Sequence, residues 1–370
     1  MIIQNAKLFL DGSFHEGNIE FRRTIERISP VRSEEGALDA GGAYLIPGLI
    51  DIHTHAAVGE DASDANADGI LKMGPYYAAE GVTSFCPTTM TLPEDALTEA
   101  VRAIASYQRP KNGAKIAGIH LEGPFINPSK CGAQNPDYIA APDIRMFDRL
   151  MDASEGLVLE ITVAPEMEGA MEFIKEASRS VSVSVGHTTA DYETALRAFD
   201  AGANKVTHLF NAMPSLLHRA PGVIAAAYES HVFAELIPDG CHVHPSMMRL
   251  SYDLFREKLV LISDSLRCAG MPDGEYELSG QIVTMKDGLA TLKGTDTIAG
   301  SSIHLMEGVR RAVSFGLPLE KMIYAATYAA AASIHKEDTI GSIEVGKCAD
   351  LVLLDSDLKV LGVFIDGERI

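Results

Sequence analysis

The sequence predicts an α/β protein in which a (β/α)8 barrel of the TIM type is inserted in a small β-sandwich domain formed by both ends of the chain. Eight apolar runs alternate with helical stretches through the middle of the chain, a pattern typical of parallel strands covered by helices. Short, alternating, turn-rich segments precede and follow this region. Histidines and carboxylates come directly after several apolar runs, and barrel enzymes place their reactive groups at strand ends.

The two ends of the chain have the pattern of short antiparallel strands. Residues 2–10 and 17–21 form strand-like runs on either side of the turn signal Asp11-Gly12. Residues 340–355 and 360–370 contain further strand-like runs. We expect these segments to pair as one small β domain, residues 1–48 plus 338–370, with the barrel domain at residues 49–337.

The apolar runs of the barrel domain predict its eight strands. They lie at residues 49–53, 82–87, 116–121, 157–163, 181–185, 205–209, 232–237 and 259–263. A doubly wound open sheet is the alternative that the same pattern leaves open. Near residues 272–293 the apolar period becomes short again around Lys286-Asp287-Gly288, which predicts a β-hairpin inserted after the eighth strand.

Composition limits the classes of partner. The 370 residues, 46% of them hydrophobic, are enough for a barrel and an accessory domain. With 51 acidic and 31 basic residues, the formal charge of −20 repels a phosphate backbone or an anionic membrane surface. We therefore expect no nucleic-acid and no membrane partner, and an anionic ligand would need a local positive pocket.

The cysteines and the N-terminus favour a cytoplasmic protein. Five widely spaced cysteines without a CxxC pair fit a reducing compartment better than a disulfide framework: Cys86, Cys131, Cys241, Cys268 and Cys348. The first residues lack a basic region followed by a long apolar run. No window approaches the roughly 18 apolar residues that a membrane-spanning helix needs.

The segment from Pro47 to His55, Pro-Gly-Leu-Ile-Asp-Ile-His-Thr-His, says most about function. On a strand, the i, i+2 spacing places His53 and His55 on one face. Same-face histidines leaving the carboxyl end of a buried strand often begin a metal site in a barrel enzyme. A bare His-x-His pair fits a core or turn position equally well, so other residues must decide between these interpretations.

Four further residues lie at the ends of other predicted strands. Glu122 comes at the end of the third strand, His187 of the fifth, His208 of the sixth and Asp264 of the eighth. All belong to types that bind metals or transfer protons, so their position at the ends of separate strands predicts one site with nitrogen and oxygen ligands. Such ligands suit Zn²⁺, Fe²⁺, Mn²⁺ or Co²⁺, and metal-assisted hydrolysis is the first functional hypothesis.

Several motifs carry a resemblance to a known family. The Pro47 to His55 segment, the Gly186-His-Thr turn, Asp264 and the late Gly346-Lys-Cys-Ala-Asp-Leu-Val segment resemble the amidohydrolase superfamily. Four more motifs resemble, in order and along nearly the whole chain, the N-acetylglucosamine-6-phosphate deacetylases within it: His120-Leu-Glu-Gly-Pro-Phe-Ile-Asn-Pro, Thr207-His-Leu-Phe-Asn-Ala-Met-Pro, Pro238-Asp-Gly-Cys-His and Ala299-Gly-Ser.

The resemblance implies roles for the six strand-end residues. Glu122, His187 and His208 become the principal metal ligands, while the intact pair His53 and His55 implies a second ion bridged by Glu122. One or two divalent ions per chain are therefore expected, with Zn²⁺ as the first candidate. Asp264 becomes the general base that takes the proton of water as metal-bound hydroxide attacks the acetyl carbonyl, and then the acid that protonates the departing amine.

The resemblance also implies contacts to an amino-sugar phosphate. Arg219 is the candidate for the phosphate because a guanidinium binds phosphate oxygens bidentately, although a lone arginine is more often a solvated surface group. The backbone at Asn211 and Ala212, and the side chain of His242, are the implied sugar-phosphate contacts. Some of these contacts reach across a dimer interface in the family, so we expect a homodimer.

Gln134 departs from the family pattern. A histidine that helps to polarise the acetyl carbonyl often stands at this position, whereas Gln134 can donate a hydrogen bond but carries no charge. We expect Gln134 to contact the substrate, with carbonyl activation depending more on the metal. Cys131, in the same loop, is interpreted as a bystander, and His120 as a candidate to support Glu122.

The leading hypothesis is a metal-dependent deacetylase that converts N-acetyl-D-glucosamine 6-phosphate and water to D-glucosamine 6-phosphate and acetate, in amino-sugar metabolism. One alternative is an amidohydrolase acting on another small N-acyl or cyclic amide, with Arg219 binding a carboxylate. A second alternative is a catalytically silent binding homologue. That alternative predicts eroded ligand positions, whereas all six are intact here.

Overall fold

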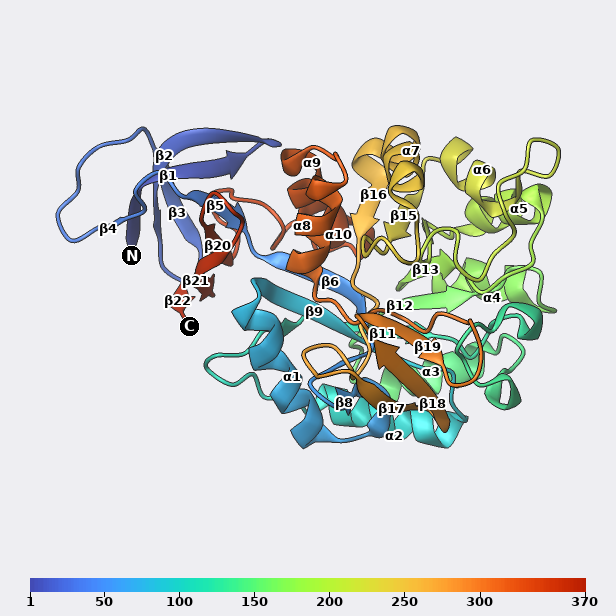
Figure 1. Cartoon of the computed structure of the whole chain (residues 1–370). Coiled ribbons are helices and arrows are strands. Elements are labelled where there is room, and N and C mark those ends of the chain that lie inside the picture. The colour runs from blue at the N-terminus through green and yellow to red at the C-terminus, as the bar shows by residue number, and fades with distance from the viewer.

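The centre of the molecule is a nearly closed parallel barrel, seen in the computed structural model that describes all 370 residues (Figure 1). Each strand pairs in parallel with the next along the chain. The strands are β6 (Leu49–Thr54), β9 (Val82–Thr89), β11 (Ile119–Glu122), β12 (Val158–Val163), β13 (Ser182–Val185), β14 (Lys205–Val206), β15 (Phe233–Leu236) and β16 (Leu259–Leu261). This sequential order confirms the predicted barrel, because a doubly wound sheet reverses its strand order.

Backbone hydrogen bonds just beyond the strand ends join the last barrel strand to the first. The N–H of Asp264 donates to the carbonyl of His53 at 2.9 Å, and the N–H of His55 donates to the carbonyl of Ser265 at 3.1 Å. Nearby, the N–H of Ser263 donates to the Asp51 carboxylate at 3.2 Å. The barrel is therefore closed at its carboxyl end, where the predicted site residues lie.

Helices and short elements surround the barrel (Figure 1). Side-chain caps fix several helix starts, as where Asp143 accepts from the N–H of Arg145 at 2.9 Å and Asp191 from that of Thr194 at 2.8 Å. None of the helices is long and apolar enough to cross a membrane. The helices are α1 (Ala67–Ala79), α2 (Glu94–Ala105), α3 (Ile144–Ala153), α4 (Ala170–Ala177), α5 (Tyr192–Ala201), α6 (Gly222–Glu229), α7 (Pro245–Phe255), α8 (Leu305–Ser314), α9 (Leu319–Ala325) and α10 (Tyr328–Ser333). The short elements are β7 (Ala56–Ala57), β8 (Glu60–Asp61), β10 (Lys115–Ile116), η1 (Ala62–Asp64), η2 (Pro128–Lys130), η3 (Pro136–Tyr138) and η4 (Arg256–Lys258).

The two ends of the chain form a separate sheet, at the left of Figure 1. Its strands are β1 (Ile2–Leu10), β2 (Ser13–Phe21), β3 (Ile25–Ser29), β4 (Leu38–Asp39), β5 (Tyr44–Pro47), β20 (Leu351–Leu354), β21 (Val360–Ile365) and β22 (Glu368–Arg369). The rings of Phe21 and Phe364 meet at 5.5 Å, although β20, β5 and β1 lie between their strands in the sheet. The sheet therefore folds over its own apolar core, as the predicted sandwich requires. The exact domain boundaries stay a prediction.

The chain crosses from the terminal sheet to the barrel at Gly48, between β5 and β6. A Cβ atom at this position would lie 2.0 Å from Oγ1 of Thr83, so a larger residue could enter only if the strands moved apart. This close approach lets β5 pair in the terminal sheet while β6 begins the barrel one residue later.

The segment after the eighth strand forms a three-stranded antiparallel sheet, of which the sequence indicated two strands. The predicted hairpin is β18 (Gln281–Lys286) with β19 (Leu289–Leu292), and β17 (Gly274–Leu278) adds a third strand. Arg267 ties this inserted sheet to the barrel, since its guanidinium donates to Asp64 and Glu277 at 2.9 and 3.2 Å. The Gln281 amide also donates to the carbonyl of Ala133 at 2.7 Å, in the loop after β11.

Truncation of Phe364 tests whether the ring contact holds the terminal sheet together. Phe364→Ala should cost about 3–5 kcal/mol because it empties a buried site between two halves of the sheet. Leu361→Ala is the matched control on the same strand, because Leu361 is 48% exposed. Urea unfolding should show a lowered midpoint for Phe364→Ala alone, and equal losses for both variants would contradict the folded-over sheet.

Candidate metal and substrate site

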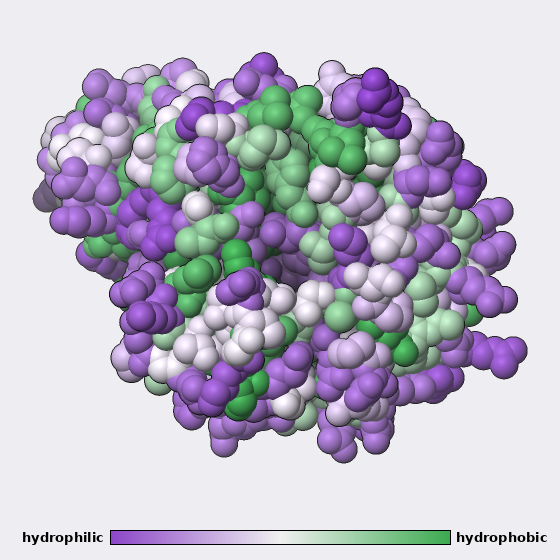
Figure 2. All heavy atoms as spheres, turned by 45° about the vertical axis from the view of Figure 1, so that its right-hand side comes forward, coloured by the Kyte–Doolittle hydropathy of each residue, from purple (hydrophilic) through white to green (hydrophobic).

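The six strand-end residues predicted from the sequence lie together at the carboxyl end of the barrel. All six residues are at most 6% exposed: His53, His55, Glu122, His187, His208 and Asp264. Five of them line a cavity of about 310 Å³, and His53 lies behind its wall. Figure 2 shows that the face toward which the barrel strands point is hollowed near its centre, with hydrophilic residues in the depth.

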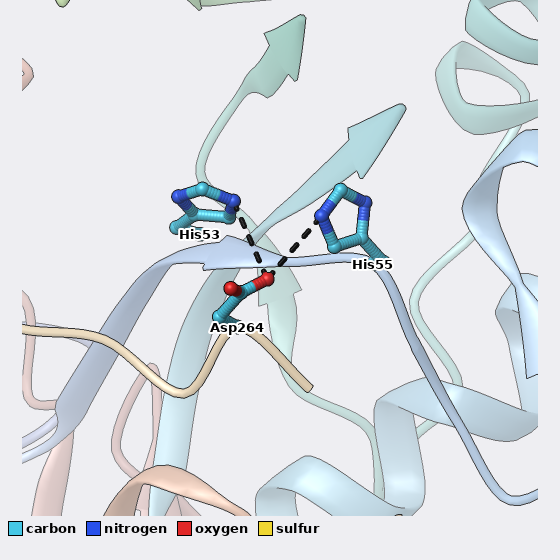
Figure 3. A group of neighbouring side chains, drawn as sticks. All are labelled: His53, His55 and Asp264. Atoms are coloured by element: carbon cyan, nitrogen blue, oxygen red, sulfur yellow. Dashed lines mark ion pairs between the residues drawn. The ribbon is translucent and has the colours of Figure 1, made fainter. Parts of the chain in front are cut away.

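His53, His55 and Asp264 form one group (Figure 3). Both imidazoles come from the end of β6 and face the carboxylate, which comes from the loop after β16. The Oδ1 atom of Asp264 lies 3.6 Å from Nε2 of His53 and 3.3 Å from Nε2 of His55. The histidine pair therefore shares one side of the strand, as the i, i+2 spacing predicted.

Glu122, His187 and His208 form a second group that meets the first through Glu122. Oε1 of Glu122 lies 3.1 Å from Nε2 of His187 and 2.9 Å from Nε2 of His208. The same carboxylate lies 3.4 Å from Nε2 of His53, and its Oε2 lies 3.2 Å from Nε2 of His55. Glu122 is thus placed between the two groups, where one carboxylate can serve two ions.

Hydrogen bonds at Nδ1 orient three of the four histidines. His55 donates to the carbonyl of Thr88 at 3.1 Å, His187 to that of Lys130 at 2.8 Å, and His53 to the Glu235 carboxylate at 3.0 Å. A proton on Nδ1 leaves the Nε2 lone pair free to bind a metal.

The donor atoms at the centre fit a divalent ion. Nε2 of His53 is buried and has no hydrogen-bond partner within the protein, and the neighbouring donors are imidazole nitrogens and carboxylate oxygens. These donors suit Zn²⁺, Fe²⁺, Mn²⁺ or Co²⁺, and no thiolate takes part.

Both carboxylates of the centre are held in the ionised form. Burial alone would raise the pKa of Glu122, but its interactions with His53 and His187 hold it well below its usual range. Burial opposes ionisation of Asp264 as well, yet the interaction with His53 and the hydrogen bond from His55 lower the pKa of Asp264. An ionised Asp264 beside the histidines has the protonation state that a general base needs.

Three of the site residues have left-handed backbone, which few non-glycine residues adopt. The φ angles are +47° at His187, +27° at His208 and +49° at Asp264. Such conformations cost about 1–3 kcal/mol each and persist only where the surrounding structure enforces them. At Asp264 that enforcement includes the hydrogen bond to the carbonyl of His53, so the strand-end turn and the barrel closure support each other.

Gln134 lines the cavity, but both ends of its amide are bound to protein groups. Its Nε2 donates to Oε2 of Glu122 at 2.5 Å, and its Oε1 accepts from the N–H of Thr91 at 2.7 Å. In this structure Gln134 therefore holds the carboxylate between the two metal groups. Its predicted contact with the substrate carbonyl stays a prediction.

The predicted substrate contacts divide into two places. Asn211, Ala212 and His242 line the cavity, whereas Arg219 is exposed and lines a separate hollow beside Thr189. The structure of one chain thus brings the first three together with the metal groups and leaves Arg219 outside. A sequence contains no direct signal for this separation, because residues 211 and 219 are close in the chain.

The structure adds residues that sequence reasoning missed. Leu278 and Ile298, from the inserted sheet and the segment after it, form part of an apolar cavity wall. Glu235 and Lys205 are fully buried in the barrel interior. A charged residue within the apolar runs 232–237 and 205–209 was the signal that could have identified them.

His120 is fully buried next to the centre. Its Nε2 lies 2.9 Å from Oγ1 of Thr162, and its ring packs at 4.5 Å from the ring of His53. Burial lowers the pKa of His120 well below its usual value, which favours the neutral ring. His120 therefore packs behind His53, whereas the sequence had pointed to Glu122 as the residue it supports.

Three comparisons with known proteins agree with one another. The sequence model of the amidohydrolase family matches residues 44–370. The N-acetylglucosamine-6-phosphate deacetylase of Vibrio furnissii is 34% identical over 352 residues, which cover 93% of this chain and 88% of the relative. The N-acetylgalactosamine-6-phosphate deacetylase of Escherichia coli O157:H7 is 36% identical over 348 residues, covering 93% of this chain and 92% of the relative.

A solved structure extends the likeness to the whole fold. It is a mutant N-acetyl-D-glucosamine-6-phosphate deacetylase from Mycobacterium smegmatis in complex with N-acetyl-D-glucosamine-6-phosphate. The two structures share a TM-score of 0.94 and 34% identity, covering 100% of this chain and 98% of that one. The terminal sheet and the barrel are therefore both part of the likeness.

The Asp239–His242 pair at the cavity wall predicts a pH-dependent stability. Nδ1 of His242 lies 2.7 Å from Oδ2 of Asp239. Burial would lower the pKa of His242, but the hydrogen bond and charge of Asp239 raise it overall. Burial opposes the shift at Asp239 too, and His242 lowers the pKa of that carboxyl.

Asp239→Asn should therefore destabilise the protein most near pH 6, by about 1.5–3 kcal/mol for a charged hydrogen bond. The raised pKa of His242 means that its contribution is fully present below about pH 6.5 and is lost as the pH rises through the folded-state value. The lowered pKa of Asp239 means that its contribution is lost as the pH falls below about 4. Urea unfolding from pH 4 to 9 measures the difference, and a pH-independent difference would contradict the pairing.

Proposed function

The chain belongs to the amidohydrolase family, and we propose that it hydrolyses the acetamide of N-acetyl-D-glucosamine 6-phosphate to give D-glucosamine 6-phosphate and acetate. The observation that carries this proposal is the Glu122-centred pair of metal groups at the floor of a cavity of about 310 Å³. Relatives with this activity match nearly the whole chain, so the likeness includes both the site and the fold around it.

The donor set fits one or two divalent ions, with Zn²⁺ as the first candidate and Fe²⁺, Mn²⁺ or Co²⁺ as the others. Glu122, His187 and His208 would hold the first ion, and His53 and His55 would hold a second with Glu122 between them. A divalent ion in this place lowers the pKa of bound water to about 7 and polarises an amide carbonyl.

Asp264 moves the proton in the proposed reaction. Its ionised carboxylate accepts a proton from the attacking water and then delivers it to the nitrogen of the departing amine, which must be protonated to leave. His53 and His55, 3.6 and 3.3 Å from Oδ1, hold the carboxylate over the floor of the cavity. Gln134 keeps Glu122 in place from the opposite side.

The phosphate needs a local positive charge because the chain as a whole carries −20. His242 supplies one within the cavity, since Asp239 favours its protonated form. Arg219 lies outside the cavity of its own chain, so we propose that a homodimer brings Arg219 of one chain to the site of the other. The backbone at Asn211 and Ala212 would complete the sugar-phosphate contacts.

One relative favours a second substrate. The Escherichia coli relative is named for N-acetylgalactosamine 6-phosphate, which differs from the glucose form in one hydroxyl orientation. Another small N-acyl or cyclic amide is not favoured by the relatives. We place the enzyme in amino-sugar metabolism and, because its five cysteines are free, in a reducing cytoplasm.

An assay on a panel of sugars tests the proposal. Protein freed of metal by chelation and reloaded with Zn²⁺, Fe²⁺, Mn²⁺ or Co²⁺ should release acetate from N-acetyl-D-glucosamine 6-phosphate. The galactosamine and mannosamine 6-phosphates and unphosphorylated N-acetylglucosamine complete the panel. Equal kcat/KM for the phosphorylated and unphosphorylated sugars would remove the phosphate from the proposed substrate.

Asp264→Asn should lower kcat by at least about 100-fold, since general acid–base catalysis contributes about 10²–10⁴-fold. Asparagine has nearly the same shape, so the protein should fold normally and keep its ions at Glu122, His187 and His208. Steady-state kinetics and metal analysis measure the two effects. Near-normal kcat in this variant would take Asp264 out of the proton transfer.

Arg219→Ala should raise KM for the phosphorylated sugar by at least about 10-fold, because a charged hydrogen bond is worth about 1.5–3 kcal/mol. Arg179→Ala is a matched control, because Arg179 is exposed and pairs only with Glu176, three residues earlier in the chain. An unchanged KM would assign the phosphate to another group.

Mixed dimers test whether Arg219 acts across subunits. When Arg219→Ala and Asp264→Asn chains are refolded together, a dimer with shared sites regains one complete site. That site combines the Asp264 of one chain with the Arg219 of the other. If Arg219 acts within its own chain, neither site of the mixed dimer is complete and the activity stays at the level of the separate variants.

A further inference from the structure

Three ionisable side chains lie buried in the barrel interior, on the β12, β14 and β15 strands. Glu160, Lys205 and Glu235 have no solvent exposure. Nζ of Lys205 lies 2.5 Å from Oε2 of Glu160 and 3.3 Å from Oε1 of Glu235. We call these residues the buried triad.

Glu235 connects this triad to both metal groups through one oxygen atom. Its Oε2 accepts from Nδ1 of His53 at 3.0 Å and from the backbone N–H of His208 at 3.2 Å. His53 belongs to the group with His55 and Asp264, whereas His208 belongs to the group with Glu122 and His187. A single carboxylate therefore contacts one member of each group.

The partner of His53 differs in kind from the partners of the other histidines. His55 and His187 donate from Nδ1 to backbone carbonyls, which are present whatever the side chain, and Nδ1 of His208 has no partner. Only at His53 does a side chain fix the tautomer. A carboxylate acceptor also makes the imidazole a stronger metal ligand than a carbonyl does.

Protein stability alone does not explain why these ionisable groups are buried. Moving charged groups from water into a protein interior costs several kcal/mol per ion, and well-packed apolar residues often replace a buried ion pair without loss. Neighbouring barrel strands show that apolar side chains fit this interior, as Val260 and Ile262 are fully buried. The buried Lys205–Glu235 ion pair is instead explained by the metal-site residues that Glu235 contacts, His53 and His208.

We propose that Glu235 is the positioning residue that decides whether the second metal ion is held, by fixing His53 as the Nδ1–H tautomer with Nε2 directed to the site. Lys205 holds Glu235 in the orientation that this requires, and Glu160 contacts Nζ of Lys205 from its own strand. The inference rests on the proposed metal-dependent function and concerns the binding of its second ion. The first ion, at Glu122, His187 and His208, keeps its side-chain donors without Glu235.

Glu235→Gln tests the proposal by metal binding, without substrate. Metal-free protein is titrated with Zn²⁺ against a chromophoric chelator, and the bound metal is counted by mass spectrometry after gel filtration. The wild type should bind two ions. The variant should bind the first ion as before and the second about 10–100-fold more weakly, as for other groups that support a metal-bound histidine.

Glu160→Gln is the matched control. It is the same substitution in the same triad, equally buried, and Glu160 contacts none of the four metal histidines: its nearest histidine is His120, at 3.9 Å. Burial raises the pKa of Glu160 to about 8 despite Lys205, so glutamine replaces a side chain that is largely neutral at pH 7. This variant should keep both ions at wild-type affinity.

Two outcomes would overturn the proposal. The first is an equal weakening of the second ion in both variants, which would assign the effect to the barrel interior in general. The second is one ion in the wild type, which would remove the second site. A protein with one ion that still deacetylates the sugar phosphate would leave the proposed function standing, so the two failures are distinguishable.

If Glu235→Gln does not fold, a double variant that removes one charge of each sign serves as the test instead. Glu235→Gln with Lys205→Met removes one charge of each sign and preserves volume, which buried ion pairs often tolerate. If its thermal unfolding is close to that of the wild type, the same titration should show selective weakening of the second ion. Two tightly bound ions in the folded double variant would also overturn the proposal.

Discussion

The backbone N–H of Asp264 donates to the carbonyl of His53 and joins the end of the last barrel strand to the end of the first. Without this closure, the histidine pair and the carboxylate would lie at opposite edges of an open sheet. With it, Oδ1 of Asp264 lies within 3.6 Å of both imidazoles. The left-handed backbone at Asp264 is the local cost of turning the chain at this point, and the closed barrel enforces it.

Charge balance within the closed barrel explains most other features of the site. Glu122 and Asp264 are buried anions, and each lies beside imidazoles that hold its pKa below the usual range despite burial. Below them Lys205 compensates Glu235, which in turn accepts a hydrogen bond from Nδ1 of His53. A divalent ion would complete this arrangement, since the free Nε2 atom and the carboxylates face the same space. The buried charged and polar groups described here are thus grouped around the proposed metal site.

The parts of the site that the sequence predicted depend on the spacing of residues within single strands. The apolar runs predicted the eight barrel strands, and the i, i+2 spacing placed His53 and His55 on one face. Other features of the site depend on distant neighbours. Gln134 lines the cavity, where its substrate contact stays a prediction, and it also binds Glu122, while Arg219 lies outside the cavity that Asn211 lines. β17 was missed because its five residues, Gly-Glu-Tyr-Glu-Leu, include two glutamates and contain no apolar run.

The sequence by itself determined the order of strands and helices, and which residue types stand at the strand ends, because hydrophobic period and turn chemistry act over a few residues. Only the tertiary structure decided which of those ends meet. Glu122 lies between two groups because barrel closure brings β6, β11, β13 and β14 around one axis, and the same closure places Glu235 of β15 within reach of His53 of β6. Contacts between residues 182 positions apart depend on the packing of the whole chain, which no local pattern contains.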